Sequence, residues 1–239
     1  MRAFILVGGL GTRLQTLDLN IPKPMIRIGS KPFLEYLIDA LKAQNIHEVI
    51  LCLGYGADSI EEYFEKGRKF GITIFYSRES RALGTGGAIK NAEPFAVEDN
   101  LILNGDSYLE LDYHRMLWFH RQKQAQITIA CTQLGETKEY GNIIIDSDNR
   151  LLSFSEKLPQ GHKNSFINGG VYIFDRSAFD FIPPEQIISV EKDTFPKAVK
   201  AGRCYSFLTD GYFIDIGTPE RLQRAQLELR TKLTKDSPQ

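Results

Sequence analysis

A glycine-rich segment near the amino terminus is followed by a framed lysine. Residues 8–14 read Gly-Gly-Leu-Gly-Thr-Arg-Leu, and residues 22–24 read Pro-Lys-Pro. Glycine lets backbone N–H groups approach a phosphate, Arg13 can hold its oxygens with a planar fork, and the prolines stiffen the backbone around Lys23. A dinucleotide fingerprint would need glycine where Leu14 stands, and the chain has no Gly-Lys pair for a P-loop. We expect another kind of phosphate loop; the alternative is a tight turn with solvated basic side chains.

Two aspartates far apart in the chain are candidate metal ligands. Asp106 and Asp215 each follow an apolar run that predicts a strand. Magnesium takes hard oxygen ligands, commonly one or two carboxylates together with substrate phosphates. The alternative for each aspartate is a capping or turn residue.

Neither histidine nor cysteine is placed for nucleophilic or metal chemistry. The cysteines are odd in number, far apart and outside metal-ligand spacings, which predicts reduced thiols packed as small hydrophobic side chains. The histidines match no catalytic motif and are expected on the surface or on helices. These residues are Cys52, Cys131, Cys204, His47, His114, His120 and His162.

The first half of the chain alternates short apolar runs with helical patterns. The predicted strands are Ala3–Val7, Val49–Leu53, Ile72–Tyr76 and Leu101–Leu103. The predicted helices between them are Pro32–Gln44, Ala57–Lys66 and Thr85–Ala92. This alternation predicts a doubly wound, mostly parallel, Rossmann-like α/β sheet, in which ligands bind beyond the carboxyl ends of the strands. The glycine segment and Asp106 both lie at such ends.

The second half predicts a small antiparallel lobe. Its predicted elements are a helix at Asp112–Gln124, strands at Gln126–Cys131, Gly141–Ile145, Leu151–Ser155 and Phe166–Phe174, a helix at Glu191–Ala201, and strands at Arg203–Leu208 and Tyr212–Ile216. Thr218-Pro219-Glu220 opens a last helix. We expect one domain over 1–239, made of a first half over about 1–110, a second half over about 111–220, and a C-terminal helix and tail over 219–239.

Composition narrows the range of partners. The chain has 239 residues and a net charge of −1, so it has no general attraction for nucleic acid or an anionic membrane. We see no targeting signal and no apolar run near the ~20 residues that span a bilayer. We expect a cytoplasmic protein without a nucleic-acid or membrane partner.

Several segments occur in a fixed order along the chain. The first is Gly9–Leu14 followed by Pro22–Pro24. The later ones are Leu83–Ala88, Asn104–Asp106, Tyr140–Asn142, Phe154–Lys157, Asn168–Tyr172 and Phe213–Pro219. Together they resemble the motifs of the sugar-phosphate nucleotidyltransferases, also called NDP-sugar pyrophosphorylases, over nearly the whole chain. The resemblance implies a GT-A-like fold in which the first half, about 1–110, binds the nucleotide and the second half, about 111–220, is a sugar-binding lobe. It also implies a homodimer.

The family resemblance also implies a reaction and a site. A sugar 1-phosphate would attack the α-phosphorus of a nucleoside triphosphate, with Mg²⁺ on Asp106 and Asp215 and with Arg13 and Lys23 as catalytic cations. The implied nucleotide-binding residues are Leu6, Gly8, Gly9, Gly11, Thr12, Arg13, Glu79, Gly84, Thr85 and Asp106. The implied sugar-phosphate-binding residues are Gly141, Glu156, Lys157, Asn168 and Gly169.

Glu79 bears on the choice of base. A carboxylate only accepts hydrogen bonds, and guanine offers two adjacent N–H donors, so we expect GTP if Glu79 faces the base; a solvated Glu79 is the alternative. The sequence of these motifs most resembles that of D-glycero-α-D-manno-heptose 1-phosphate guanylyltransferases. Mannose-1-phosphate guanylyltransferases and N-acetylmuramate or hexose 1-phosphate uridylyl- or thymidylyltransferases are alternatives. Phe213, where the family often has tryptophan, and Leu158, where it usually has proline, depart from the pattern.

Two other classes compete with an active sugar nucleotidyltransferase. A non-catalytic relative that binds a sugar nucleotide would tolerate loss of reactive groups, yet Arg13, Lys23, Asp106, Lys157 and Asp215 are all present. A cytidylyltransferase acting on a non-sugar alcohol phosphate would not need the segments that resemble a sugar pocket.

Overall fold

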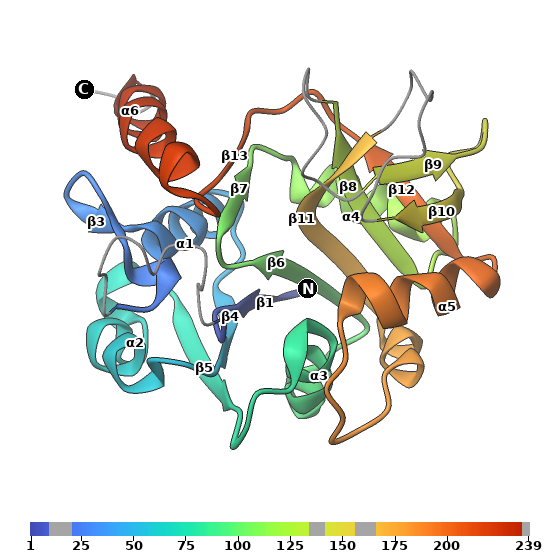
Figure 1. Cartoon of the computed structure of the whole chain (residues 1–239), viewed down its shortest axis with the longest axis horizontal. Helices are drawn as coiled ribbons and strands as arrows, with labels where there is room; N and C mark the ends of the chain where they lie inside the picture. The colour runs from blue at the N-terminus through green and yellow to red at the C-terminus, as the bar shows by residue number, and fades with distance from the viewer. Residues whose placement is uncertain (10–20, 134–141, 156–165, 236–239) are drawn as a thin grey trace.

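The structure is a computed structural model that describes residues 1–9, 21–133, 142–155 and 166–235. Within these residues, nine strands form a central sheet with helices on both faces (Figure 1). This is the mixed, mostly parallel α/β fold that the sequence predicts.

The bounds of the elements are as follows. The main sheet contains β1 (Arg2–Leu6), β4 (Glu48–Leu53), β5 (Thr73–Arg78), β6 (Asp99–Asn104), β8 (Ile127–Thr132), β9 (Asn142–Ile145), β10 (Leu151–Ser155), β11 (Phe166–Asp175) and β12 (Cys204–Leu208). Two short pairs are β2 (Arg27–Ile28) with β3 (Lys31–Pro32), and β7 (Ser107–Leu109) with β13 (Phe213–Asp215). The α-helices are α1 (Phe33–Ala43), α2 (Ala57–Phe64), α3 (Gly84–Asn91), α4 (Tyr113–Gln122), α5 (Phe195–Lys200) and α6 (Pro219–Lys235). Val190–Thr194 forms a π-helical turn directly before α5, and Lys23–Met25, Arg68–Phe70, Glu93–Phe95 and Arg176–Phe181 are 3₁₀ turns.

The strand order creates a switch point beside β1. Strands β6, β1, β4 and β5 are neighbours in that order and run parallel. The chain builds outward from β1 to β5 and then returns to place β6 on the other side of β1. Ligands of doubly wound sheets bind at such a reversal, beyond the carboxyl ends of the strands. The loops after β1 and β6 therefore lie where a ligand is expected.

The antiparallel half is joined to this sheet through β11. That strand pairs antiparallel with β6, β8 and β9, while β12 pairs parallel with β8. One continuous sheet therefore carries elements from both predicted halves of the chain.

Side chains that alternate along β1 form two cores. Ala3 and Ile5 pack with the apolar residues of α1 and α2, whereas Phe4 packs on the opposite face with those of α3 and α5. Such two-sided burial explains why the parallel strands are apolar without alternation. All three cysteines are buried and free, as the sequence predicts. In the described part of the chain, no helix is both long and apolar enough to cross a membrane.

Among the differences between the structure and the predicted elements, two concern segments that contact predicted site residues. Strand β7 follows Asp106 almost immediately, and with three residues it is too short to leave a pattern; its pairing with β13 is what defines it. The predicted helix Glu191–Ala201 is divided into the π-helical turn and α5, with Ser189 capping the start. Such π-turns are rare and are frequently found at functional sites.

Candidate active site

The base of the predicted phosphate loop is fixed to its neighbours at the switch point. Gly105 N–H, after β6, donates to the Leu6 carbonyl at the end of β1 (3.0 Å). On the other side the backbones touch so closely that a Cβ at Gly54 would lie 2.8 Å from the oxygen of Gly8. Gly9, the next residue, is exposed, and none of the described residues lies within 4 Å of its Cβ position. The base of the loop therefore packs between the segments that follow β4 and β6, and its last described residue is exposed.

Part of the predicted site lies outside the described residues. This applies to Gly11, Thr12, Arg13, Gly141, Glu156 and Lys157. Their roles remain predictions.

Lys23 reaches across the switch point to Asp106. It begins a short 3₁₀ turn between Pro22 and Pro24, and its Nζ donates to Asp106 Oδ2 at 2.6 Å. The lysine side chain is 15% exposed, whereas the aspartate side chain is 41% exposed. The sequence suggested a phosphate-binding cation and a metal ligand; the structure brings the two into direct contact.

Asp215 lies beside Asp106 because their strands pair. Asp215 is the register partner of Ser107, and Ile216 N–H donates to the Asp106 carbonyl at 3.0 Å. The buried Asp215 carboxylate accepts from Gly217 N–H at 2.7 Å and from Arg221 Nη1 at 3.3 Å. The sequence reasoning missed Arg221. Its signal was its position in the first turn of α6, six residues after a predicted metal ligand.

These charged groups converge on one small region. A point at the Cβ position of Gly217 lies 2.7 Å from Asp215 Oδ1, 3.7 Å from Arg221 Nη1 and 3.8 Å from Lys23 Nζ. Among the described residues, no cluster of three or more histidine, cysteine or acidic side chains could enclose a metal ion. Two adjacent carboxylates with hard oxygen donors nevertheless fit Mg²⁺, which takes its remaining ligands from water and substrate phosphates.

The predicted sugar-binding strand is bent at its glycines. The register between β11 and β8 shifts between Asn168 and Tyr172, and Gly170 has φ +72°, a left-handed conformation that favours glycine. Gly170 N–H donates to Asn168 Oδ1 at 2.9 Å, and Asn168 Nδ2 donates to the Tyr172 hydroxyl at 2.8 Å. A Cβ at Gly169 would lie 2.6 Å from the Leu109 side chain. Bulges beside active sites typically re-aim a side chain, here that of Asn168.

Glu79 lies directly after β5, at the rim of the switch region. Its Oε2 accepts from Leu83 N–H at 3.2 Å, which anchors the carboxylate to the loop before α3. Partial burial raises the pKa of Glu79 above its usual value, and the Leu83 hydrogen bond opposes that rise. Glu79 is half-buried, and among the described residues none donates a hydrogen bond to its second carboxylate oxygen, Oε1.

The start of α3 is tied to the π-helical turn. Gly84 is its first residue, and the N–H groups of Gly86 and Gly87, in the same first turn, donate to the Ile188 carbonyl at 2.8 and 3.3 Å. Those two N–H groups are therefore occupied and do not present an open anion site. Thr85 Oγ1 donates to Glu191 Oε2 at 3.0 Å. Sequence reasoning did not single out Glu191, because only the fold brings it beside Thr85.

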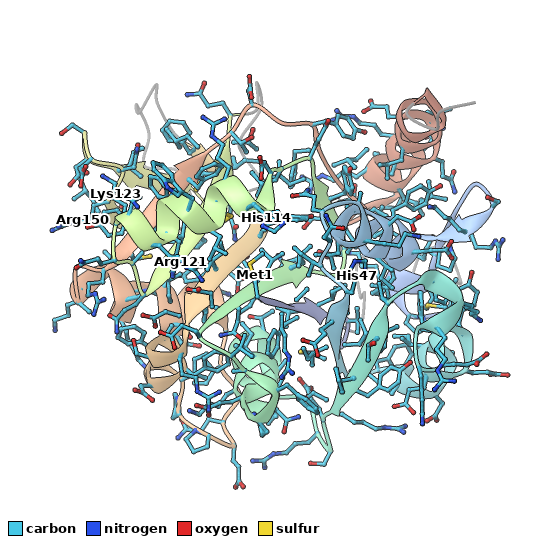
Figure 2. All side chains as sticks on the ribbon, turned by 180° about the vertical axis from the view of Figure 1, so that it is seen from behind. Met1, His47, His114, Arg121, Lys123 and Arg150 are labelled. Carbon is cyan, nitrogen blue, oxygen red and sulfur yellow. The ribbon has the colours of Figure 1, made fainter. Side chains whose placement is uncertain are left out.

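The described histidines take no part in this charged region. His47 and His114, labelled in the rear view of Figure 2, are exposed and contact the carbonyls of Gly71 and Gln44. His120 is buried on α4, with Nδ1 2.8 Å from Thr128 Oγ1. The site therefore suits charge neutralisation and positioning rather than histidine catalysis.

Comparison with known proteins places these features in a family. The profile of the nucleotidyl transferase family matches residues 2–232. The chain is 42% identical over 231 residues to the D-glycero-alpha-D-manno-heptose 1-phosphate guanylyltransferase of Aneurinibacillus thermoaerophilus, covering 96% of this chain and 99% of that protein. It is 40% identical over 222 residues to the protein of the same name from Campylobacter jejuni, covering 92% and 96%.

A solved structure agrees with this assignment. HddC from Yersinia pseudotuberculosis, in complex with GMP-PN, matches with a TM-score of 0.83 and 36% identity, covering 95% of this chain and 99% of that one. With a profile match over nearly its whole length and relatives of 42% and 40% identity, the chain belongs to the nucleotidyl transferase family.

Proposed function

We propose that this enzyme transfers GMP from GTP to D-glycero-α-D-manno-heptose 1-phosphate, giving GDP-heptose and pyrophosphate. Two relatives of at least 40% identity carry the name of that activity, and a related structure holds GMP-PN. The observation that carries the proposal is the contact between Lys23 and Asp106 at the switch point, with Asp215 beside them.

The proposed reaction needs no side-chain nucleophile. A phosphate monoester has a second pKa near ~6, so the sugar 1-phosphate is already ionised at neutral pH. One of its oxygens forms a bond to the α-phosphorus of GTP while the bond to the bridging α–β oxygen breaks. Pyrophosphate leaves with that electron pair. The difficulty is the approach of two polyanions in line, so positioning and charge neutralisation dominate catalysis.

The described cations and carboxylates divide this task. Asp106 and Asp215 would hold Mg²⁺, which neutralises charge on the reacting phosphates when it is bound. Lys23 contacts Asp106 without substrate, and we expect its ammonium group to move to the α-phosphoryl oxygens when they arrive. Its carboxylate partner is then available to the metal. Arg221 would keep Asp215 oriented during this exchange.

Three further groups complete the proposal. Arg13 would bind the triphosphate and Lys157 the sugar phosphate, both as predicted from the family resemblance. Glu79, fixed to Leu83 by one carboxylate oxygen, would accept the two N–H donors of guanine. Asn168 would contact the sugar.

Location and assembly complete the proposal. Three buried, free cysteines support a reducing compartment such as the cytoplasm. We also propose a homodimer, as the family resemblance suggests; light scattering after gel filtration would test it.

The test is a grid of pyrophosphate release with GTP, ATP, UTP, dTTP and CTP against heptose, mannose, glucose and N-acetylmuramate 1-phosphates. We expect the highest kcat/KM for GTP with the manno-configured heptose phosphate, and loss of activity in EDTA that Mg²⁺ restores. Glu79→Gln should lower the ratio of kcat/KM for GTP to that for the other triphosphates by about tenfold or more, since one bidentate contact contributes ~1–3 kcal/mol.

The outcomes separate the parts of the proposal. Release with no pair would contradict an active enzyme. Preference for UTP or dTTP would contradict only the assignment of guanine, and preference for mannose 1-phosphate only that of heptose.

A further inference from the structure

The phenol ring of Tyr172 is buried in the core next to the bend of β11. The side chain is fully buried, and the residue pairs with Ile102 of β6 and Ile129 of β8. Phe195 of α5 packs edge-on against its ring, with centroids 5.2 Å apart. The ring is therefore enclosed by its neighbours, and the packing defines where its hydroxyl lies.

That hydroxyl joins two strands that carry different parts of the site. It accepts from Asn168 Nδ2 at 2.8 Å and lies 3.4 Å from Asn104 Nδ2. Asn168 belongs to the predicted sugar strand, and Asn104 ends β6, two residues before Asp106. A buried hydroxyl needs hydrogen-bond partners, and here both come from side-chain amides at the site.

The Asn168 amide is held at both ends. Its oxygen accepts from Gly170 N–H and its nitrogen donates to Tyr172. An amide group has two N–H donors and an oxygen with two lone pairs, so one donor and one lone pair stay available to a ligand. Asn168 is half-buried, so part of the residue is exposed. Rotation of the amide would break both hydrogen bonds, so its orientation is set before a ligand binds.

We propose that Tyr172 is a positioning residue for sugar recognition, whose hydroxyl orients the Asn168 amide toward the sugar 1-phosphate. This inference rests on the proposed contact of Asn168 with the sugar. Burial raises the pKa of Tyr172 well above its usual value, so the hydroxyl keeps its proton throughout the working pH range. Tyr172 itself does not touch the substrate.

The test is Tyr172→Phe, which keeps the ring and removes the hydroxyl. We expect the KM for the sugar 1-phosphate to rise about tenfold, the effect of one lost hydrogen bond, while the KM for GTP changes less than twofold. Asn168→Ala should raise the sugar KM at least as much. Adding Tyr172→Phe to Asn168→Ala should then have little further effect on that KM, because the two side chains act as one unit.

A matched control separates positioning from a general loss of packing. Tyr36 on α1 is also buried, and its hydroxyl donates to the Ile28 carbonyl at 2.7 Å. Tyr36→Phe loses a buried hydroxyl contact outside the sugar strand, and should leave both KM values unchanged. Asn104→Ala removes the second amide from the Tyr172 hydroxyl and keeps the tyrosine. It is expected to raise the sugar KM about threefold, and it continues the test if Tyr172→Phe does not fold.

Each of the other possible results contradicts one part of the proposal. If Asn168→Ala raises the sugar KM and Tyr172→Phe does not, Asn168 binds sugar without help and the positioning role is wrong. If Tyr172→Phe raises both KM values equally, its role is structural. If Asn168→Ala leaves the sugar KM unchanged, the proposed sugar contact fails, and the inference fails with it. None of these results alters the test of guanylyl transfer, which uses the unmodified enzyme.

Discussion

Strand β6 has an aspartate ion pair near each end, and the two pairs are enclosed differently. At the amino end, Asp99 accepts from Arg121 Nε at 3.0 Å and Nη2 at 2.6 Å, and the aspartate side chain is 7% exposed. Beyond the carboxyl end, Lys23 Nζ donates to Asp106 Oδ2, also at 2.6 Å, but that carboxylate is 41% exposed. Equal distances therefore conceal different environments.

The difference in carboxylate exposure indicates which ion pair can exchange partners. A guanidinium fork holds the Asp99 oxygen with two donors, and a buried carboxylate cannot turn to water if the fork leaves. The Asp106 carboxylate has one ammonium donor and an open side toward solvent. In the proposed mechanism it is therefore the second pair that exchanges its lysine for a metal ion while the lysine binds phosphate. It also lies at the end of the parallel strands where ligands bind.

The largest expected effect is at the exchangeable pair. Lys23→Ala should lower the rate of pyrophosphate release about 10²–10³-fold, because it removes a donor to charge that develops in the transition state. The midpoint of thermal unfolding should move little, since a pair with a half-exposed carboxylate contributes ~0–1 kcal/mol to stability. Steady-state kinetics at saturating substrates and calorimetry measure the two effects.

Lys31 offers the matched control. It is a partly buried lysine bonded to the half-exposed Asp39, on the hairpin β2–β3 and α1. Lys31→Ala should keep the rate within about twofold. An unchanged rate in Lys23→Ala would show that the Pro-Lys-Pro segment is structural. It would also contradict a catalytic role for the Lys23–Asp106 pair.

The next largest effect is the pH dependence of stability at the enclosed end. His120 is 2% exposed, and burial lowers its pKa to about 4; Asp99 and Asp175 oppose this shift, whereas Arg121 and Arg203 add to it. In the unfolded chain its pKa is ~6.5, so between these values the unfolded state binds more protons. Stability is therefore lost as the pH falls from ~6.5 toward 4, by up to about 3 kcal/mol.

Urea unfolding between pH 7.5 and 4.5 measures this loss. His120→Gln removes the titrating group and should flatten the decline. A variant with the same pH slope as the unmodified protein would show that other groups cause the acid loss.

The sequence predicted a functional role for the exposed Asp106, beyond the carboxyl end of β6, but did not single out the buried Asp99 at the amino end. Asp106 follows a buried strand directly, and the rule that ligands bind beyond parallel strands is enough to locate it. The pairing of Lys23 with Asp106 could not be read from the sequence, because their contact spans 83 positions and depends on the strand order. The sequence placed His120 on the surface or on a helix; it is on a helix, but it is buried.

The antiparallel half was predictable as strands but not as geometry. The strand Phe166–Phe174 is confirmed to within one residue, yet the bend at Gly170 and the turn of Asn168 toward Tyr172 depend on a register shift against β8. Likewise Glu191 meets Thr85 only because a π-helical turn packs against the start of α3. Local patterns specify elements, whereas contacts between distant elements decide which side chains meet.

The smallest effect in this series is the loss of stability expected for Asp99→Asn, and the same substitution at Asp106 is its counterpart at the other end of β6. Asp99→Asn keeps the shape of the side chain but removes a charged acceptor from Arg121, and should lower the free energy of unfolding by about 2 kcal/mol. Activity per folded molecule should stay the same. Asp106→Asn should do the reverse: stability within about 0.5 kcal/mol of the unmodified protein, but strongly reduced pyrophosphate release. Urea unfolding and initial rates give both quantities. If Asp99→Asn inactivated the folded enzyme, or Asp106→Asn destabilised it equally, enclosure would not be what separates the two carboxylates.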